Sequence, residues 1–167
     1  VDIEWAAEMA VHGSLFNTGQ VCTSIERIYV HKSIAEAFVA ELVDQASKWT
    51  VGPGNDPINK LGPLIDADQR DLIHAQVFEA QLKGAQVLIG GEPLPGPGYF
   101  YPPTVVLNPP DDSRLMTEET FGPVITVCVV ESFKEGINRA NISSYGLSAS
   151  ALTKNPENIE VASHLNA

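Results

Sequence analysis

Residues 124–131 read Val-Ile-Thr-Val-Cys-Val-Val-Glu, a run of apolar and β-branched residues that lacks polar alternation. Such residues favour extended backbone. A strand without polar alternation is typical of one that is covered on both faces, as in a parallel sheet. We therefore predict a central strand at residues 124–131, with helices packed on either side of it.

Helices and strands alternate on both sides of this run. We expect strands at residues 26–31, 86–89, 104–107 and 147–152, and helices at residues 3–16, 33–48, 67–83, 133–141 and from 156. Three residue pairs have the capping-box spacing of a helix start: Ser33 with Glu36, Asp66 with Gln69, and Ser132 with Glu135. Repeated strand and helix units predict an α/β domain with an open, mostly parallel sheet flanked by helices.

The composition indicates an acidic globular protein. Lys and Arg number 10 against 21 Asp and Glu, which gives a formal net charge of −11. No basic cluster is present, so we expect no nucleic-acid partner. No apolar run reaches the roughly 20 residues that span a bilayer, so we expect no membrane association. Two distant cysteines and the lack of a signal peptide predict a reducing, cytoplasmic location.

Cys22 is the residue with the clearest chemical potential. It lies in the segment Phe16-Asn17-Thr18-Gly19-Gln20-Val21-Cys22-Thr23-Ser24, between a predicted helix and a predicted strand. A thiolate is a strong nucleophile towards carbonyl carbon. Gly19 permits a tight turn that can bring the sulfur and backbone N–H groups to one point, as an oxyanion requires. The residues alone leave a buried structural cysteine as an alternative.

This segment resembles the active-site signature of the aldehyde dehydrogenase family, written loosely as F-x-N-x-G-Q-x-C. A second segment, Glu118-Glu119-Thr120-Phe121-Gly122-Pro123-Val124, resembles the family's E-E-x-F-G-P-V motif. The two stand in the family's order and at its spacing. Shorter matches, among them Val51-Gly52 and Tyr145-Gly146-Leu147, extend the resemblance over essentially the whole chain. The fold that it implies is the catalytic-domain type of this family.

The resemblance implies oxidation of an aldehyde to a carboxylate with NAD or NADP. Cys22 would attack the aldehyde to form a thiohemiacetal, hydride would pass to the nicotinamide, and water would hydrolyse the resulting thioester. Asn17 and Gln20 would support the thiol loop, and Val21 and Thr23 would line the substrate tunnel. Glu119 and Gln69 would bind the nicotinamide ribose, and Phe121 would support the nicotinamide ring.

Several parts of the family pattern are missing from residues 1–167. The family's general base is a glutamate in an upstream E-L-G-G segment, and the second oxyanion donor is an upstream asparagine. Neither is present, nor is the cofactor-binding domain or the oligomerisation tail. We therefore interpret residues 1–167 as a thiol-bearing catalytic-domain fragment, inactive alone as a dehydrogenase. The parent enzyme would be a homodimer or homotetramer, so we expect exposed apolar edges on the fragment.

Other hypotheses remain open. The thiol could serve a cofactor-independent esterase or acyl transferase, although Glu119 and Phe121 would then have no purpose. The fragment could also be a non-catalytic binding module, which would leave Cys22 unreactive. Glu118 and Glu119 could be a solvated acidic turn, or a pair for acid/base chemistry. Four scattered histidines and two distant cysteines match no zinc pattern, so we predict no metal site.

Overall fold

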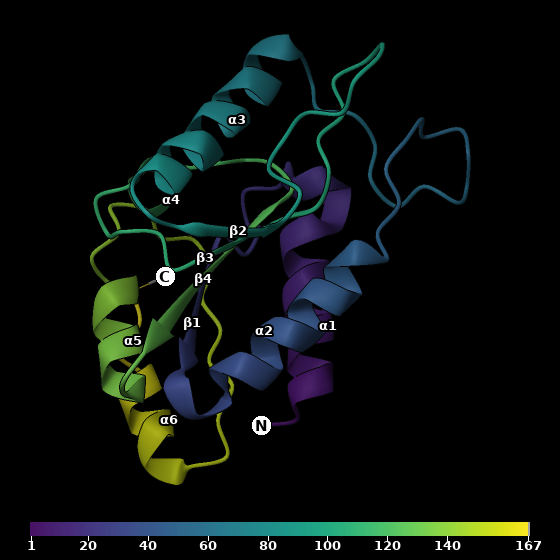
Figure 1. Ribbon diagram of the computed structural model, residues 1–167. Helices are drawn as coiled ribbons and strands as arrows, with labels where there is room; N and C mark the ends of the chain where they lie inside the picture. The colour runs from purple at the N-terminus through teal and green to yellow at the C-terminus, as the bar shows by residue number, and fades with distance from the viewer. Residues whose placement is uncertain (167) are drawn as a thin grey trace.

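The central strand of the sheet is β4, Val124–Val130, in the computed structural model, which describes residues 1–166. It pairs in parallel with β1, Arg27–His31, on one side and with β3, Thr104–Leu107, on the other. The edge strand β2, Gln86–Ile89, runs antiparallel to β3, so the order is β1-β4-β3-β2 (Figure 1). The mostly parallel sheet predicted from the sequence is confirmed.

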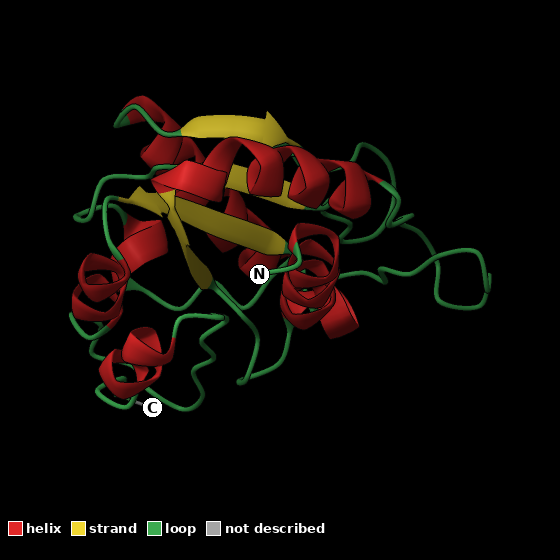
Figure 2. Cartoon of the chain, turned by 90° about the horizontal axis from the view of Figure 1, so that it is seen from below, coloured by secondary structure: helices red, strands yellow, loops and turns green. Residues whose placement is uncertain are grey.

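Side chains of β4 alternate between two apolar clusters, one on each face of the sheet. Ile125 and Val127 pack against α1, Ile3–Leu15, and α2, Lys32–Ser47. Val124 points to the opposite face, under α3, Ala67–Leu82. The remaining helices are α4, Arg114–Thr117, α5, Phe133–Ala140, and α6, Pro156–Ala162. Helices lie on both faces of the sheet (Figure 2). Only Val129 among the β4 residues is not fully buried, which explains the absence of polar alternation.

Two of the three predicted capping boxes begin a helix where expected. Asp66 Oδ1 accepts from the backbone N–H of Gln69 at 2.8 Å, and Ser132 Oγ accepts from that of Glu135 at 3.1 Å. The reciprocal half of the Asp66 box does not form, because the Gln69 side chain binds residues 120–121 instead. Asn155 caps α6, with Pro156 at its first position.

The third predicted box, at Ser33 and Glu36, is wrong. The helix α2 begins at Lys32, and its N-cap is His31, two residues before the predicted cap. The imidazole Nδ1 of His31 accepts from the Ser33 backbone N–H at 3.2 Å. His31 also ends β1, so strand and helix join without an intervening loop, and this leaves Ser33 inside the helix rather than before it.

The predicted strand at residues 147–152 is wrong as well. This segment is coil, and its apolar residues Leu147 and Leu152 are 59% and 44% exposed. A strand needs a neighbour that pairs with its backbone N–H and C=O groups. Within residues 1–166, no strand pairs with this segment, which loops between α5 and α6 (Figure 1).

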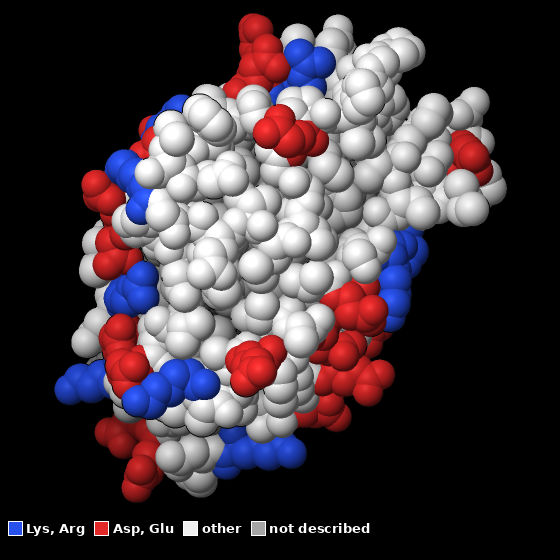
Figure 3. Space-filling model, in the orientation of Figure 1, with Lys and Arg blue, Asp and Glu red and all other residues white. Residues whose placement is uncertain are grey.

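Charged residues surround one face of the molecule, and exposed apolar residues lie along α1. Figure 3 shows Lys and Arg interspersed with Asp and Glu around the rim of one face, whose centre is uncharged. Trp5, Met9 and Phe16, which are 49%, 40% and 58% exposed, follow one another along α1 and the turn after it. The expected exposed apolar area is therefore present. None of the described helices combines the length and hydropathy needed to cross a membrane.

We expect Ile125→Ala to lower the free energy of unfolding by roughly 2–5 kcal/mol, because it leaves a cavity beside a fully buried strand. Ile142→Ala is the matched control, since that side chain is 76% exposed and its loss should change stability by less than about 0.5 kcal/mol. Urea denaturation of both variants measures the difference. Equal losses would contradict the placement of β4 at the centre of the core.

Candidate active site

Parallel pairing of β1 with β4 places the residues that precede both strands at one edge of the sheet. The segment before β1 carries Cys22, and the segment before β4 carries Glu119 and Phe121. The two motifs are far apart in the sequence, yet the strand register brings their loops together. This edge is the candidate active site.

The thiol loop, residues 16–24, begins with an unusual backbone turn. After α1 ends at Leu15, Asn17, Thr18 and Gly19 have φ values of 51°, 61° and 72°. This left-handed conformation suits glycine, but it costs a residue with a side chain about 1–2 kcal/mol, and β-branched residues such as Thr18 rarely adopt it. The turn reverses the chain and leaves Cys22 exposed.

Side-chain hydrogen bonds hold this strained turn. Asn17 Nδ2 donates to the Gln20 carbonyl at 3.1 Å, across the turn. Thr18 Oγ1 donates to the Gly62 carbonyl at 3.3 Å. Gln20 Nε2 donates to the Pro63 carbonyl at 3.3 Å, while its Oε1 accepts from the Ile65 backbone N–H at 3.0 Å. The turn is therefore tied to residues 62–65, which lead into α3.

The thiol loop and the loop at residues 118–123, which we call the acidic loop, touch backbone to backbone. A Cβ atom added at Gly19 would lie 2.0 Å from the carbonyl oxygen of Gly122. A Cβ atom added at Gly122 would lie 2.3 Å from Cδ1 of Ile73 in α3. Glycine at position 19 therefore allows the two loops to lie in contact, and glycine at position 122 leaves room for the Ile73 side chain of α3.

The acidic loop is held from two directions. Gln69 Nε2, from the first turn of α3, donates to the carbonyls of Thr120 at 2.9 Å and Phe121 at 3.2 Å. Glu26 Oε1 accepts from the backbone N–H groups of the same two residues at 2.9 and 3.0 Å. Phe121 itself has a φ of 52°, so these bonds hold a second strained residue.

Sequence reasoning did not identify Glu26. Its partner Thr120 lies 94 positions away, and Glu26 belongs to neither motif. A single glutamate at the start of a predicted strand has no local pattern that distinguishes it from a solvated one. Only the strand register that brings the two loops together reveals its contact.

The two adjacent glutamates of the acidic loop differ in their environments. Arg114 Nη2 lies 2.9 Å from Glu118 Oε2, and Gln76 Nε2 donates to the same oxygen at 3.2 Å. The hydrogen bond from Arg114, with a smaller one from Gln76, lowers the pKa of Glu118. The Glu119 side chain is exposed, and nothing in residues 1–166 forms a hydrogen bond or salt bridge with its carboxylate. Glu118 therefore has a structural partner, whereas Glu119 is free to bind a ligand.

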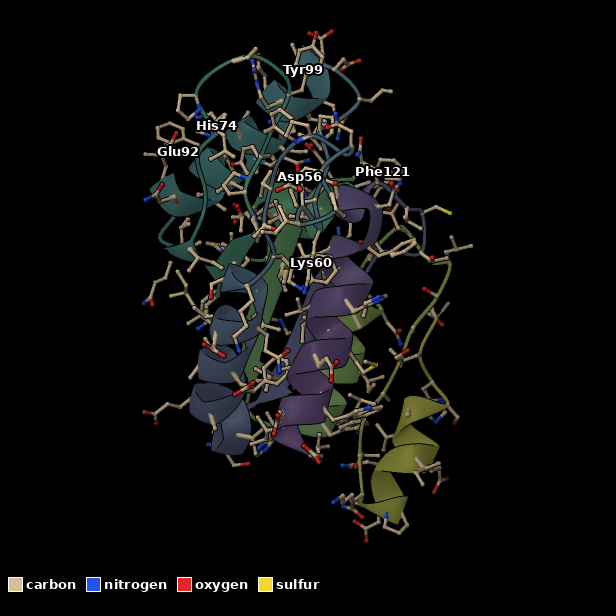
Figure 4. All side chains as sticks on the ribbon, turned by 90° about the vertical axis from the view of Figure 1, so that its right-hand side faces the viewer. Asp56, Lys60, His74, Glu92, Tyr99 and Phe121 are labelled. Atoms are coloured by element: carbon tan, nitrogen blue, oxygen red, sulfur yellow. The ribbon has the colours of Figure 1, made fainter. Side chains whose placement is uncertain are left out.

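An open hollow of about 600 Å³ lies beside these loops. Figure 4 shows Phe121 beside the end of α1, at the border of this region. Five of the residues predicted for the site do not line the hollow: Val21, Cys22, Thr23, Gln69 and Glu119. The residues that line it are Asn17, Gln20, Pro63, Leu64, Ile65 and Phe121.

The two cysteines have opposite environments. Cys128 lies inside β4, where burial raises the pKa of its thiol to about 11, and its Sγ is 3.8 Å from Sδ of Met116. Cys22 is exposed, and we find no partner for its backbone N–H within residues 1–166. Cys22 thus has both an accessible sulfur and a free donor beside it. No group of described residues has the composition of a metal site.

Comparisons with known proteins show the family of the chain and its fold. The family model described as "Aldehyde dehydrogenase family" matches residues 1–167. The chain is 40% identical to "Aldehyde dehydrogenase, mitochondrial" of Leishmania tarentolae, over 99% of this chain and 34% of that protein. It is 42% identical to succinate-semialdehyde dehydrogenase (NADP+) 1 of Mycobacterium ulcerans, over 92% of this chain and 33% of the relative.

Solved structures give the same result. The lactaldehyde dehydrogenase of Escherichia coli superposes with a TM-score of 0.95 at 36% identity, over 99% of this chain and 35% of that one. Betaine aldehyde dehydrogenase of Staphylococcus aureus, in complex with NAD+, superposes with a TM-score of 0.91 at 36% identity, over 98% of this chain and 34% of that one. The chain spans about a third of the length of the curated relatives it matches.

Gly19→Ala tests the contact between the loops. We expect it to lower the free energy of unfolding by about 2 kcal/mol or more beyond the loss from Gly84→Ala, because it adds a steric clash to the left-handed penalty. Gly84 is the matched control, with a φ of 102° and nothing within 4 Å of an added Cβ. Denaturant unfolding measures both. Equal losses would show that the two loops do not meet at Gly19.

Proposed function

Because this chain belongs to the aldehyde dehydrogenase family, we propose that it is the thiol-bearing part of an enzyme that oxidises an aldehyde to a carboxylate with NAD or NADP. The observation that carries the proposal is the contact of Gly19 with Gly122. It holds a loop with an exposed thiol against a loop with a free carboxylate and an aromatic ring. Oxidation of an aldehyde at a thiol needs this combination, because nucleophile and hydride acceptor must meet at one carbon.

Cys22 is the proposed nucleophile. Its thiolate attacks the aldehyde carbon, a C–S bond forms as the C=O π bond breaks, and the former carbonyl oxygen of the resulting thiohemiacetal takes the negative charge. The free backbone N–H of Cys22 is available to stabilise this oxyanion. NAD(P)+, when bound, would supply the hydride acceptor, so that loss of hydride from the former aldehyde carbon would leave a thioester on Cys22. Water then attacks the thioester on Cys22, which releases the carboxylate and regenerates the thiol. The base that activates this water would come from another part of the whole protein.

The described residues fit a nicotinamide nucleotide. Glu119 has a carboxylate without a protein partner, and a carboxylate accepts two hydrogen bonds from a ribose diol. Phe121 presents a ring at the border of the hollow, where it would support the nicotinamide. The side-chain amide of Gln69 donates its N–H groups to carbonyls of the acidic loop, which leaves its oxygen to accept a hydrogen bond from a ribose hydroxyl. Asn17 and Gln20 would keep the thiol loop in place during the reaction.

The substrate is proposed only as an aldehyde. Val21 and Thr23 flank the nucleophile and would line the substrate tunnel. The names of similar proteins include succinate semialdehyde, lactaldehyde and betaine aldehyde as substrates, and others name NAD or NADP, so they assign neither one aldehyde nor one cofactor. A homo-oligomer is proposed for the whole protein, with exposed apolar residues such as Trp5 available for a partner. A reducing compartment is proposed as well; one relative is named as mitochondrial.

The hypothesis of a cofactor-independent esterase or acyl transferase uses the same thiol. It gives no role to the free carboxylate of Glu119 or to the strained backbone that presents Phe121. A non-catalytic binding module gives no role to an exposed thiol beside an unpaired N–H group. The dehydrogenase is therefore the function that the geometry supports best.

Thiol alkylation tests the nucleophile. We expect iodoacetamide at pH 8 to label Cys22 in the folded chain and to leave Cys128 unmodified, because Cys128 is buried and its pKa of about 11 leaves a thiolate fraction of about 10⁻³. Mass spectrometry locates the adduct, and an unfolded sample shows labelling at both positions. In the whole protein, Cys22→Ser should abolish aldehyde-dependent NAD(P)H formation, whereas Cys128→Ser should retain it. Folded-state labelling of Cys22 no faster than in the unfolded chain would count against a preorganised nucleophile.

Phe121→Ala and Phe121→Gly separate the ring from the backbone strain. Both variants lack the ring, so we expect both to raise the KM for NAD(P)+ in the whole protein. The φ of 52° favours glycine, so Phe121→Gly should be more stable than Phe121→Ala by about 1 kcal/mol. Urea denaturation measures the difference. An alanine variant that is the more stable of the two would mean that residue 121 does not hold this conformation.

A further inference from the structure

Glu26 lies outside both motifs, four residues after Cys22 and directly before β1. Its side chain does not point into solvent but crosses to the acidic loop. There a single carboxylate oxygen accepts the backbone N–H of Thr120 at 2.9 Å and that of Phe121 at 3.0 Å. Hydrogen bonds to an ionised carboxylate are stronger than those between neutral groups. Glu26 is thus the anion that binds two adjacent amides of the loop that carries Glu119.

These two amides belong to the backbone that sets the orientation of Phe121. Phe121 has a left-handed backbone, which is unfavourable for a residue with a side chain, and strained residues persist only when their surroundings over-determine them. The carbonyls of Thr120 and Phe121 are bound by Gln69, and their N–H groups are bound by Glu26. Without Glu26 only one side of this backbone would be held.

The segment that connects Cys22 to Glu26 is itself fixed to α1. Ile25 N donates to the Gly13 carbonyl at 3.1 Å, and Ser14 Oγ donates to the Ile25 carbonyl at 2.7 Å, so this short segment is fixed to α1. The next residue, Arg27, donates from Nη2 to the Glu118 carbonyl at 2.9 Å. The segment that follows Cys22 therefore binds the acidic loop at two places.

We propose that Glu26 is a positioning residue for the dehydrogenase reaction. Its carboxylate holds the backbone of residues 120–121 and thereby sets where Glu119 and Phe121 hold the nicotinamide nucleotide relative to Cys22. The inference rests on the proposed function. It assigns to Glu26 an effect on cofactor binding, with no part in the chemistry of the thiol, because within residues 1–166 its carboxylate forms hydrogen bonds only with the acidic loop.

The test compares Glu26→Ala and Glu26→Gln with Glu36→Ala, an exposed glutamate of α2, in the whole protein. We expect Glu26→Ala to speed hydrogen exchange at the Thr120 and Phe121 amides and to raise the KM for NAD(P)+, each by roughly ten-fold, because it removes a charged acceptor from both amides. Glu26→Gln, which keeps an acceptor oxygen, should give a smaller rise. Cofactor-free hydrolysis of an activated ester by Cys22 should change less than about two-fold.

Three results would overturn the inference. The first is exchange at both amides that equals that of Glu36→Ala. The second is faster exchange with an unchanged KM for NAD(P)+. The third is an equal loss of ester hydrolysis and cofactor binding, which would make Glu26 a general structural residue. Each of these leaves the proposed function intact, whereas a wild-type protein without NAD(P)-dependent aldehyde oxidation would overturn the proposed function together with this inference.

Discussion

The contact between Gly19 and Gly122 is the constraint on which the rest of the site depends. An added Cβ at Gly19 would lie 2.0 Å from the Gly122 carbonyl oxygen, so the two backbones meet with nothing between them. The thiol follows one glycine, and the free carboxylate and the aromatic ring precede the other. Parallel pairing of β1 with β4 makes this meeting possible, because both loops enter neighbouring strands from the same edge. The sheet and the site are therefore consequences of the same pairing.

Hydrogen bonds and the chain segments between them form a closed path around this contact. The path runs from Gln20 to residues 63–65, along α3 to Gln69, across the acidic loop to Glu26, and back through the segment before β1 to the thiol loop. Each left-handed residue along this path costs about 1–2 kcal/mol, whereas one hydrogen bond contributes a net gain of only about 1 kcal/mol. One hydrogen bond is therefore not enough to hold the left-handed residues of a loop. The strained conformations persist because several bonds from different elements act on each loop.

The sequence was informative where the signal is local. A long apolar run predicted β4, and the side-chain caps at Asp66, Ser132 and Asn155 predicted three helix starts. It failed at Ser33, where an adjoining strand moved the helix start, and at residues 147–152, where pairing depends on a neighbouring strand. The motifs identified Cys22 and Glu119 as candidates. They could not identify Glu26, or the different environments of Glu118 and Glu119, because these depend on contacts between distant residues.

The helix α3 links the two halves of the site mechanically. Its N-terminus follows the segment bound by Gln20, its first turn holds residues 120–121 through Gln69, and Gln76, two turns further on, binds Glu118 and the Glu119 carbonyl. A helix is stiff along its axis, so α3 couples the position of the thiol loop to that of the acidic loop. The spacing between the proposed nucleophile and the proposed cofactor site therefore depends on α3 as well as on the contact between the two loops.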